Sequence, residues 1–493
     1  AVAEISLAKK CGNKDIKCFE ACRELHHSML DGMEYPAAKA VLNFLDKWEP
    51  QKAEENNLVA QYAKEILSGA NMVFRFNGGY VHDDPQLASV WQKANAKQKD
   101  NIGQCLVTGA LDEIQKTHPT IKGVQGAQSS GAALVSFNAS AFCSYNKEQN
   151  QNAPVGKYAA FAYTTALNHL LADRKNVHRI GDAAVVCWAE NADKQYEDFA
   201  AEVFFGDNVD KSDEQRLSAL RTSLKLLADG LPCKEMDLDP DRKFYILGLS
   251  PNAARLAVRF FYCDSFGKIA GNIYKHHERL EIVRPSYDKF PILPLWKLLS
   301  ATVNPNAKDK TPNAAMAGAV ARAVFSGGRY PASLLECTFL RIKAERNITR
   351  ERAAIIKAYY LRNPNEKCPK EVLTVSLNEN SKNIPYTLGR LFSVYEEIQQ
   401  AANPGINTTI KDRYFGSAAA MPATVFPILS NLAQKHLRKL SDAQRVYLDK
   451  KVMTLKSVLG EQYPAHMSLP EQGSFDLGYY HQTQARYTKK EDK

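Results

Sequence analysis

The N-terminal segment holds a local grouping of residues that could bind a metal. Cys11, Cys18 and Cys22 are followed by His26 and His27, so thiolate and imidazole groups occur within one short stretch. Such residues bind zinc when their spacing brings them to one tetrahedral site. The spacing here matches no common zinc module. Thiols buried along a helix are the alternative interpretation, and we assign no metal.

Three other clusters could support catalysis, but none has a complete set of partners. Ala127–Gly131 (A-Q-S-S-G) loosely matches a nucleophile elbow, yet the strand before it is unconvincing and spacing identifies no His or Asp partner. Asp237, Asp239 and Asp241 could serve a two-metal nuclease, although a turn before a strand explains them better. His276–Glu278 could bind metal, but adjacent helical residues point apart, which favours an exposed helix. Because no G-x-x-x-x-G-K-[ST] phosphate loop occurs either, we expect no enzyme and no cofactor.

An uncharged segment offers a different chemistry. Residues 123–140 (GVQGAQSSGAALVSFNAS) combine small residues with Gln, Ser and Asn. Gly126 and Gly131 can adopt positive φ without steric cost, and the neutral side chains can donate and accept hydrogen bonds. One interpretation is close approach to another molecule. The other is a surface loop leading into a strand at Ala132–Phe137.

Positive charge is in excess and partly clustered. The 493 residues include 64 Lys and Arg and 54 Asp and Glu, for a net charge of +10 and a pI near 8.9. Residues 321–362 hold nine basic and three acidic residues, which is typical of a phosphate-contacting surface but also of a solvated helical face. Ser250-Pro251 predicts the start of a helix, on which Arg255 and Arg259 share one face.

Composition indicates a large globular protein of a reducing compartment. With 45% hydrophobic residues the chain can bury a large core, and its length suggests about three domains. Its ten cysteines include no C-x-x-C pair. No membrane span or signal peptide is evident, so we expect a cytoplasmic protein. Because residue 1 is Ala, we also expect the natural chain to begin upstream.

The elements that must position these residues indicate an α+β fold that is predominantly helical. Residues 1–115 are predicted to be mostly helical, with a hairpin near 71–84. The segment 116–250 is a mixed α/β region with a helix at 155–172 and strands at 183–189 and 243–250. Residues 251–371 form a basic helical region ending in a polar linker at 362–371. Residues 372–493 form a C-terminal helical bundle, in which Ser441 and Gln444 predict a capping box and Gly460 a helix end.

Four blocks in this order carry a resemblance to a known family: GAQSSGAALVSFN, YILGLSPNAARLAVRFF, YTLGRLFSVYEEIQ and DRYFGSAAAMPATVFPILSNLAQKHL. They resemble the large subunit of the type I-C CRISPR surveillance complex, Cascade. The resemblance runs from about Phe44 to about Gly460. The family's strand-rich N-terminal region is not visible before Ala1, and in the family that region performs part of the recognition of the protospacer-adjacent motif (PAM).

The resemblance implies a DNA-binding role without catalysis. The expected tasks are binding foreign duplex at its PAM, helping to open it for the guide RNA, holding the displaced strand and docking a helicase-nuclease. Implied partners are guide RNA, target DNA, the Cascade backbone and guide-processing subunits, and a small subunit similar to residues 372–493. A structural scaffold subunit and a metal-dependent nuclease are the alternatives.

The residue types match this role in two ways. Neutral donors on the loop would approach base edges, and guanidinium groups would hold a strand. The residues assigned to DNA or RNA binding are Gln125, Gln128, Ser129, Ser130, Asn138, Asn252, Arg255, Arg259, Arg341, Arg346, Arg350 and Arg352.

Overall fold

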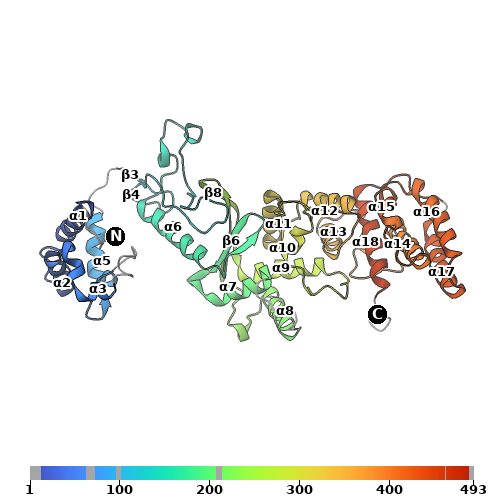
Figure 1. Cartoon of the computed structure of the whole chain (residues 1–493), viewed down its shortest axis with the longest axis horizontal. Helices are drawn as coiled ribbons and strands as arrows, with labels where there is room; N and C mark the ends of the chain where they lie inside the picture. Colours follow the sequence, from blue (N-terminus) through green and yellow to red (C-terminus); the bar gives the residue numbers. More distant parts are fainter. Residues whose placement is uncertain (1–12, 63–72, 96–100, 207–213, 461, 488–493) are drawn as a thin grey trace. The chain divides into compact units, whose positions relative to one another are not determined.

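The computed structural model describes residues 13–62, 73–95, 101–206, 214–460 and 462–487, and the predicted α+β, predominantly helical class is confirmed (Figure 1). The chain divides into two compact units. The first comprises residues 1–114 with 154–157, and the second comprises residues 115–153 with 158–493. Within the described ranges, no helix combines the length and apolar character needed to cross a bilayer. The division into four segments stays a prediction.

The first unit contains a small helical core and two short hairpins. Its helices are α1 (Asn13–Leu30), α2 (Pro36–Lys47), α3 (Asn57–Gln61) and α5 (Pro85–Asn95). Its strands are β1 (Arg75–Phe76), β2 (Gly79–Tyr80), β3 (Ile102–Gln104) and β4 (Leu111–Glu113). The predicted hairpin is confirmed, because Arg75 pairs with Tyr80 across a turn in which Asn77 and Gly78 both have positive φ.

A four-stranded antiparallel sheet organises the beginning of the second unit. Its strands are β5 (His178–Ile180), β6 (Ala183–Ala189), β7 (Lys243–Asn252) and β8 (Arg255–Ser265), in that spatial order. The predicted strands at 183–189 and 243–250 are confirmed, as is the helix at 155–172, which is α6 (Lys157–Ala172). Leu167 and Leu171 of α6 pack against Leu249 on one face of the sheet. The opposite face lies in the unit's main core.

The predicted helix after Ser250 is wrong, because β7 and β8 form a hairpin there. Asn252 pairs with Arg255, and Ala253 in the two-residue turn has a φ of +53°. The Ser-Pro pair was a valid local helix signal, but β8 also contains Val258 and three consecutive aromatic residues, Phe260–Tyr262, which favour a strand. Pairing with β7 over ten residue pairs decides the outcome.

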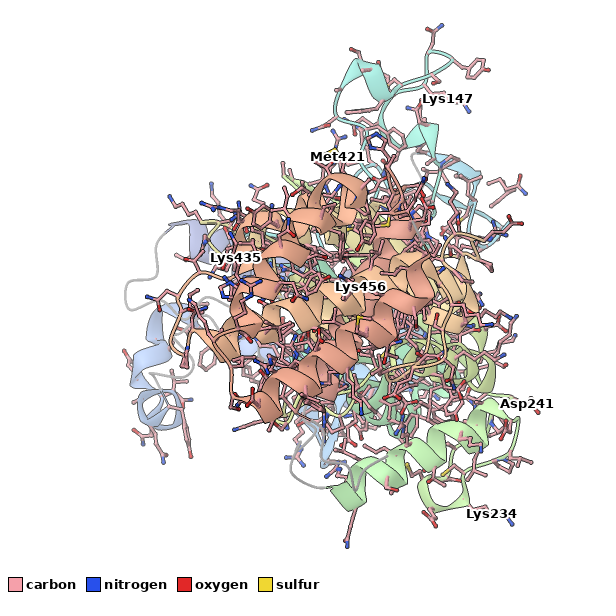
Figure 2. The ribbon with its side chains drawn as sticks, turned by 90° about the vertical axis from the view of Figure 1, so that its right-hand side faces the viewer. Lys147, Lys234, Asp241, Met421, Lys435 and Lys456 are labelled. Atoms are coloured by element: carbon pink, nitrogen blue, oxygen red, sulfur yellow. The ribbon has the colours of Figure 1, made fainter. Side chains whose placement is uncertain are left out.

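The strand expected at Ala132–Phe137 is also not formed. Only Ala132 and Ala133 make single bridges, to Ile121 and Arg255 respectively. The chain then continues through 3₁₀ turns at Ser140–Phe142 and Gln149–Asn152. Lys147 lies in the segment between them, which projects from the rest of the unit (Figure 2).

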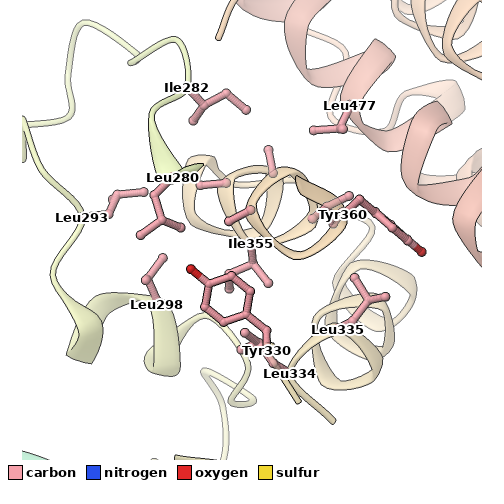
Figure 3. Close-up of a cluster of buried hydrophobic side chains, with 14 of the residues drawn as sticks. Leu280, Ile282, Leu293, Leu298, Tyr330, Leu334, Leu335, Ile355, Tyr360 and Leu477 are labelled. Carbon is pink, nitrogen blue, oxygen red and sulfur yellow. The ribbon is translucent and has the colours of Figure 1, made fainter. Parts of the chain in front are cut away.

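Helices packed against the sheet and against one another form the centre of the second unit. They are α7 (Lys194–Ala200), α8 (Glu214–Ala228), α9 (Phe266–Leu280), α10 (Leu295–Ser300), α11 (Ala314–Ser326), α12 (Ala332–Glu345) and α13 (Arg350–Arg362), with a π-helical turn at Ala201–Phe205. Leu280, Leu298 and Ile355 converge from α9, α10 and α13 in one apolar core (Figure 3). The burial of these side chains provides the main stabilisation of this region.

The predicted C-terminal bundle is confirmed. Its helices are α14 (Ile384–Ala402), α15 (Ile410–Ala420), α16 (Pro422–Leu437), α17 (Asp442–Leu459) and α18 (Leu469–Ala485). Ser441 and Gly460 flank α17 as predicted, but the capping box does not form. Ser441 Oγ donates to the side-chain oxygen of Gln444 at 3.3 Å and caps no backbone N–H. The core continues from the sheet into this bundle, and Cys368 in the predicted linker is buried in it.

Two glycines allow α14 and α18 to approach closely along the centre of the bundle. A Cβ atom on Gly389 would lie 1.9 Å from the backbone oxygen of Phe475, and one on Gly478 would lie 2.1 Å from the backbone oxygen of Tyr386. Both contacts are with main-chain atoms, which cannot rotate away. The separation of the two helices therefore depends on the absence of these side-chain atoms.

We expect Gly389→Ala to lower the free energy of unfolding by roughly 3 kcal/mol, because α14 and α18 must move apart. Gly416→Ala is the matched control: Gly416 also lies in a helix, but a Cβ there would meet nothing within 4 Å. The control should stabilise the chain by about 1 kcal/mol through helix propensity. Urea unfolding of both variants measures the difference, and equal effects would contradict the close helix contact.

Candidate nucleic-acid interface

A pair of backbone hydrogen bonds closes the uncharged loop at its base. Ile121 and Ala132 donate to each other's carbonyl oxygens at 2.9 Å. The side chain of Val124 is buried beside α6 and anchors the loop to the sheet. Gly126 (+86°) and Gly131 (+101°) adopt the positive φ that glycine allows without steric cost. Residues 122–131 thus form a closed loop on a fixed base.

The loop packs against the tip of the β7–β8 hairpin. Ala133 donates to the carbonyl of Ala254, and Leu256 donates to the carbonyl of Ala133, both at 3.0 Å. A Cβ on Gly126 would lie 3.2 Å from Cγ of Pro251, so a side chain there would crowd Pro251, and the φ of +86° also favours glycine. Two segments about 120 residues apart in sequence, each singled out for its residue types, therefore form one surface.

The neutral side chains of the loop are on its outer surface. Gln125, Gln128, Ser129 and Ser130 are exposed, and Oε1 of Gln125 accepts a hydrogen bond from a guanidinium nitrogen of Arg179 at 2.8 Å. Arg179 was not among the residues predicted from the sequence. Its signal was the V-H-R-I pattern of β5, in which Arg179 is the exposed residue between two buried ones.

Arg255 is held at the hairpin tip by two contacts. Its guanidinium donates to the side-chain oxygen of Asn138 and lies 4.1 Å from the ring centroid of Phe142. Among the described residues it forms no ion pair, so its charge is not neutralised by a carboxylate. Asn252 is exposed beside it. Phe142 is a contact that the sequence did not indicate.

Arg259 has a different orientation from Arg255. The register of the hairpin shifts between Gly248 and Leu249, and Arg259 is the extra residue of this bulge on β8. Its guanidinium donates to Ser250 Oγ at 2.9 Å and to Asp182 Oδ2 at 3.3 Å. The expected pairing with Arg255 on a helical face is therefore wrong.

Much of the positive charge in residues 321–362 is used inside the protein. Arg350 is 6% exposed and donates to Asp288 and to the carbonyl of Pro291. Arg352 is 3% exposed and donates to the carboxylate of Glu345 at 2.6 Å. These partners bond the terminal nitrogens of both guanidinium groups and fix the beginning of α13, whereas Nε of Arg350 has no partner among the described residues. Their assignment to DNA binding stays a prediction.

The other two arginines of this stretch differ in exposure. Arg341 is half-buried and lies 3.6 Å from a carboxylate oxygen of Glu345. Arg346 is exposed at the end of α12, where its φ is +51°. Of the four arginines assigned between 341 and 352, Arg346 is therefore the one whose charge faces solvent.

Among the described residues, none of the possible catalytic clusters gains the set of partners that its chemistry would need. His276 is buried, and its Nδ1 lies 2.6 Å from the hydroxyl of Tyr330, so the exposed position expected for His276–Glu278 is wrong at His276, whereas Glu278 is exposed. Asp239 accepts from the backbone N–H of Asp241 in a turn before β7, as expected. Cys22 Sγ lies 3.6 Å from His26, whereas Cys11 is outside the described residues. Over the described ranges, no three His, Cys, Asp or Glu side chains are grouped to hold a metal ion.

Lys357 also belongs to the basic stretch 321–362, and its buried position can be tested by changing the pH. It is 3% exposed, its ammonium donates to the carbonyl of Arg279 at 3.0 Å, and burial lowers its pKa to about 8. Because lysine in the unfolded chain has a pKa near 10.4, the unfolded state binds the proton more tightly between about pH 8 and 10.4. Stability contributed by Lys357 should therefore rise with pH across this window, by up to ~3 kcal/mol.

Denaturant unfolding of the unmodified chain and of Lys357→Met at pH 7.5 and pH 10 measures this effect. The difference in unfolding free energy between the two proteins should shift in favour of the unmodified chain at pH 10. An unchanged difference would mean that Lys357 is solvated.

Comparison with known proteins identifies the family. The model of the family described as CRISPR-associated protein (Cas_Csd1) matches residues 2–487. A search of curated proteins gave no match. The matched range covers nearly all of the chain, including the closed loop, the hairpin and the C-terminal bundle. The chain therefore belongs to the Cas_Csd1 family of CRISPR-associated proteins.

Proposed function

We propose that this chain is the large subunit of a type I-C Cascade and binds target duplex DNA at its PAM without catalysing a reaction. The observation that carries the proposal is the joining of the uncharged loop to the Arg255 hairpin tip in one exposed surface. Membership of the Cas_Csd1 family supports a CRISPR role. The chemistry of this surface supports contact with DNA.

Neutral side chains are suited to recognising base edges. Gln and Ser can donate and accept hydrogen bonds with bases, while adding no charge that would strengthen binding to every sequence. Gln125, Gln128, Ser129 and Ser130 therefore have the role of reading the PAM. The closed base of the loop keeps their positions defined, which lowers the entropy cost of ordering them on DNA.

Arginine at the same surface is suited to the phosphate backbone. The guanidinium of Arg255 has no carboxylate partner among the described residues, so a phosphate can take that place. Arg179, which bonds Gln125, and Asn252, which pairs with Arg255 across the hairpin turn, are further donors. In this arrangement the arginines position the duplex and the neutral loop selects the sequence.

The remaining tasks of the proposed subunit involve other parts of the chain. The displaced strand, the guide RNA, the Cascade backbone and guide-processing subunits and a recruited helicase-nuclease are its proposed partners. The C-terminal bundle would act like the separate small subunit that resembles it. Support comes from the basic residues of α16 and α17 and of the turn between them: Lys435, Arg438, Lys439, Arg445, Lys450, Lys451 and Lys456. Figure 2 labels Lys435 and Lys456.

A selection experiment separates sequence reading from phosphate binding. The full chain is incubated with duplexes that carry a randomised flanking segment, and bound duplexes are sequenced. The unmodified chain should enrich a short motif. Replacing Gln125, Gln128, Ser129 and Ser130 by alanine should abolish the enrichment, because the neutral donors are lost. Asn431→Ala with Gln434→Ala, which removes exposed neutral amides on α16, is the control and should keep it.

Arg255→Ala should instead weaken binding to all duplexes alike, by about five- to ten-fold, and reduce the salt dependence of binding by about one phosphate contact. Target capture that is unimpaired in both the Arg255 and the loop variants would favour the scaffold alternative. Metal-dependent cleavage by the chain would favour the nuclease alternative.

A further inference from the structure

Three aromatic rings form a row across the sheet, toward the end that lies opposite the β7–β8 hairpin tip. Trp188 of β6 and Tyr245 of β7 stack with ring centroids 5.3 Å apart and an interplanar angle of 8°. Phe261 of β8 continues the row, with its centroid 6.5 Å from that of Tyr245 and an angle of 28°. The three rings, which we call the aromatic ladder, are nearly parallel and come from three adjacent strands.

The ladder is the open part of a sheet face that is otherwise covered. Its neighbours on the same face, such as Leu247 and Leu249, are buried beneath α6 and the closed loop. Phe261 is 56% exposed, and Trp188 and Tyr245 are half-buried. Because strand residues alternate between faces, Phe244 and Ile246 lie in the core on the other side. Other residues therefore pack both faces of the sheet, and this packing does not explain why the three rings are exposed.

The polar groups around the ladder favour a negatively charged ligand that carries hydrogen-bonding edges. Within the described part of the chain, the indole N–H of Trp188 and the hydroxyl of Tyr245 have no hydrogen-bond partner. Lys243 precedes Tyr245 by two residues on β7, and therefore lies on the same face. It is exposed, and no described carboxylate pairs with it. A flat aromatic surface, free donors and one free cation are the components of a base-stacking site.

We propose that the aromatic ladder binds unpaired bases of a single-stranded nucleic acid by stacking, with Lys243 at the phosphate. The proposal rests on the function proposed above and adds a second binding site to it. The continuity of β8 supports the link: Phe261 follows Arg255 by six residues, or about 20 Å of strand. A strand that separates from a duplex at the hairpin tip would reach the ladder within a few nucleotides.

Binding of labelled single strands to the full chain tests the proposal, with oligomers of deoxythymidine and of uridine as the two probes. Phe261→Ala should weaken binding of at least one probe about ten-fold or more, because a stacking contact is lost. Phe261→Leu should weaken it nearly as much, since leucine keeps apolar area but has no aromatic face. Tyr287→Ala, which removes a ring that is 83% exposed outside the ladder, is the control and should bind normally.

Trp188 gives a second readout that does not depend on affinity. Stacking of a base on the ladder should quench its fluorescence, and Trp188→Phe should remove that part of the signal while Trp296→Phe keeps it. Thermal unfolding of each variant verifies that the fold is retained.

The outcomes separate this proposal from the function on which it rests. Normal single-strand affinity in Phe261→Ala, or full affinity in Phe261→Leu, would overturn the ladder as a stacking site. So would a change in the oligomeric state of Phe261→Ala without a change in affinity, which would make the ladder a protein contact. Duplex binding that still depends on Arg255 would in each case leave the proposed function standing. Tighter binding of the uridine oligomer would identify RNA as the preferred ligand, and tighter binding of the deoxythymidine oligomer would identify DNA.

Discussion

The antiparallel pairing of β7 with β8 is the constraint on which the rest of the candidate interface depends. It turns the chain back at Ala253 and so places Arg255 at an exposed tip, where the segment 133–138 can bond to it. It also aligns Tyr245 with the row of rings that ends at Phe261. A helix in the same place would have separated the loop from the arginine and dispersed the rings. Backbone pairing therefore brings neutral donors, a cation and an aromatic surface to one sheet.

The distribution of charge follows a second constraint, which is the cost of burying an ion. Arg350 and Arg352 are inside the protein because carboxylates and carbonyl groups meet each guanidinium there. Arg255 and Arg346 have no such enclosure. The nine basic and three acidic residues of 321–362 consequently overstate the positive charge that a nucleic acid would meet there, and the hairpin tip gains importance relative to this segment.

The sequence predicted those elements whose signals are local and redundant. The apolar run at 183–189 predicted a strand, and the Asn-Gly turn after Phe76 predicted a hairpin, and both are present. The Ser250-Pro251 signal failed because pairing with a distant strand outweighed it. The contact between Asn138 and Arg255 joins residues 117 positions apart, and no local pattern encodes it. The burial of Arg350 could not be predicted either, because the residue type does not distinguish a buried arginine from an exposed one.

Amide hydrogen exchange of the full chain, with and without a duplex that carries its preferred flanking motif, tests the central claim most directly. The claim is that the closed loop and the hairpin tip together form the surface that contacts DNA. Binding should slow exchange in residues 123–138 and 250–257 at the same duplex concentration, because both segments become covered in one event. Slowed exchange elsewhere in the chain, with these two segments unchanged at saturation, would contradict the account.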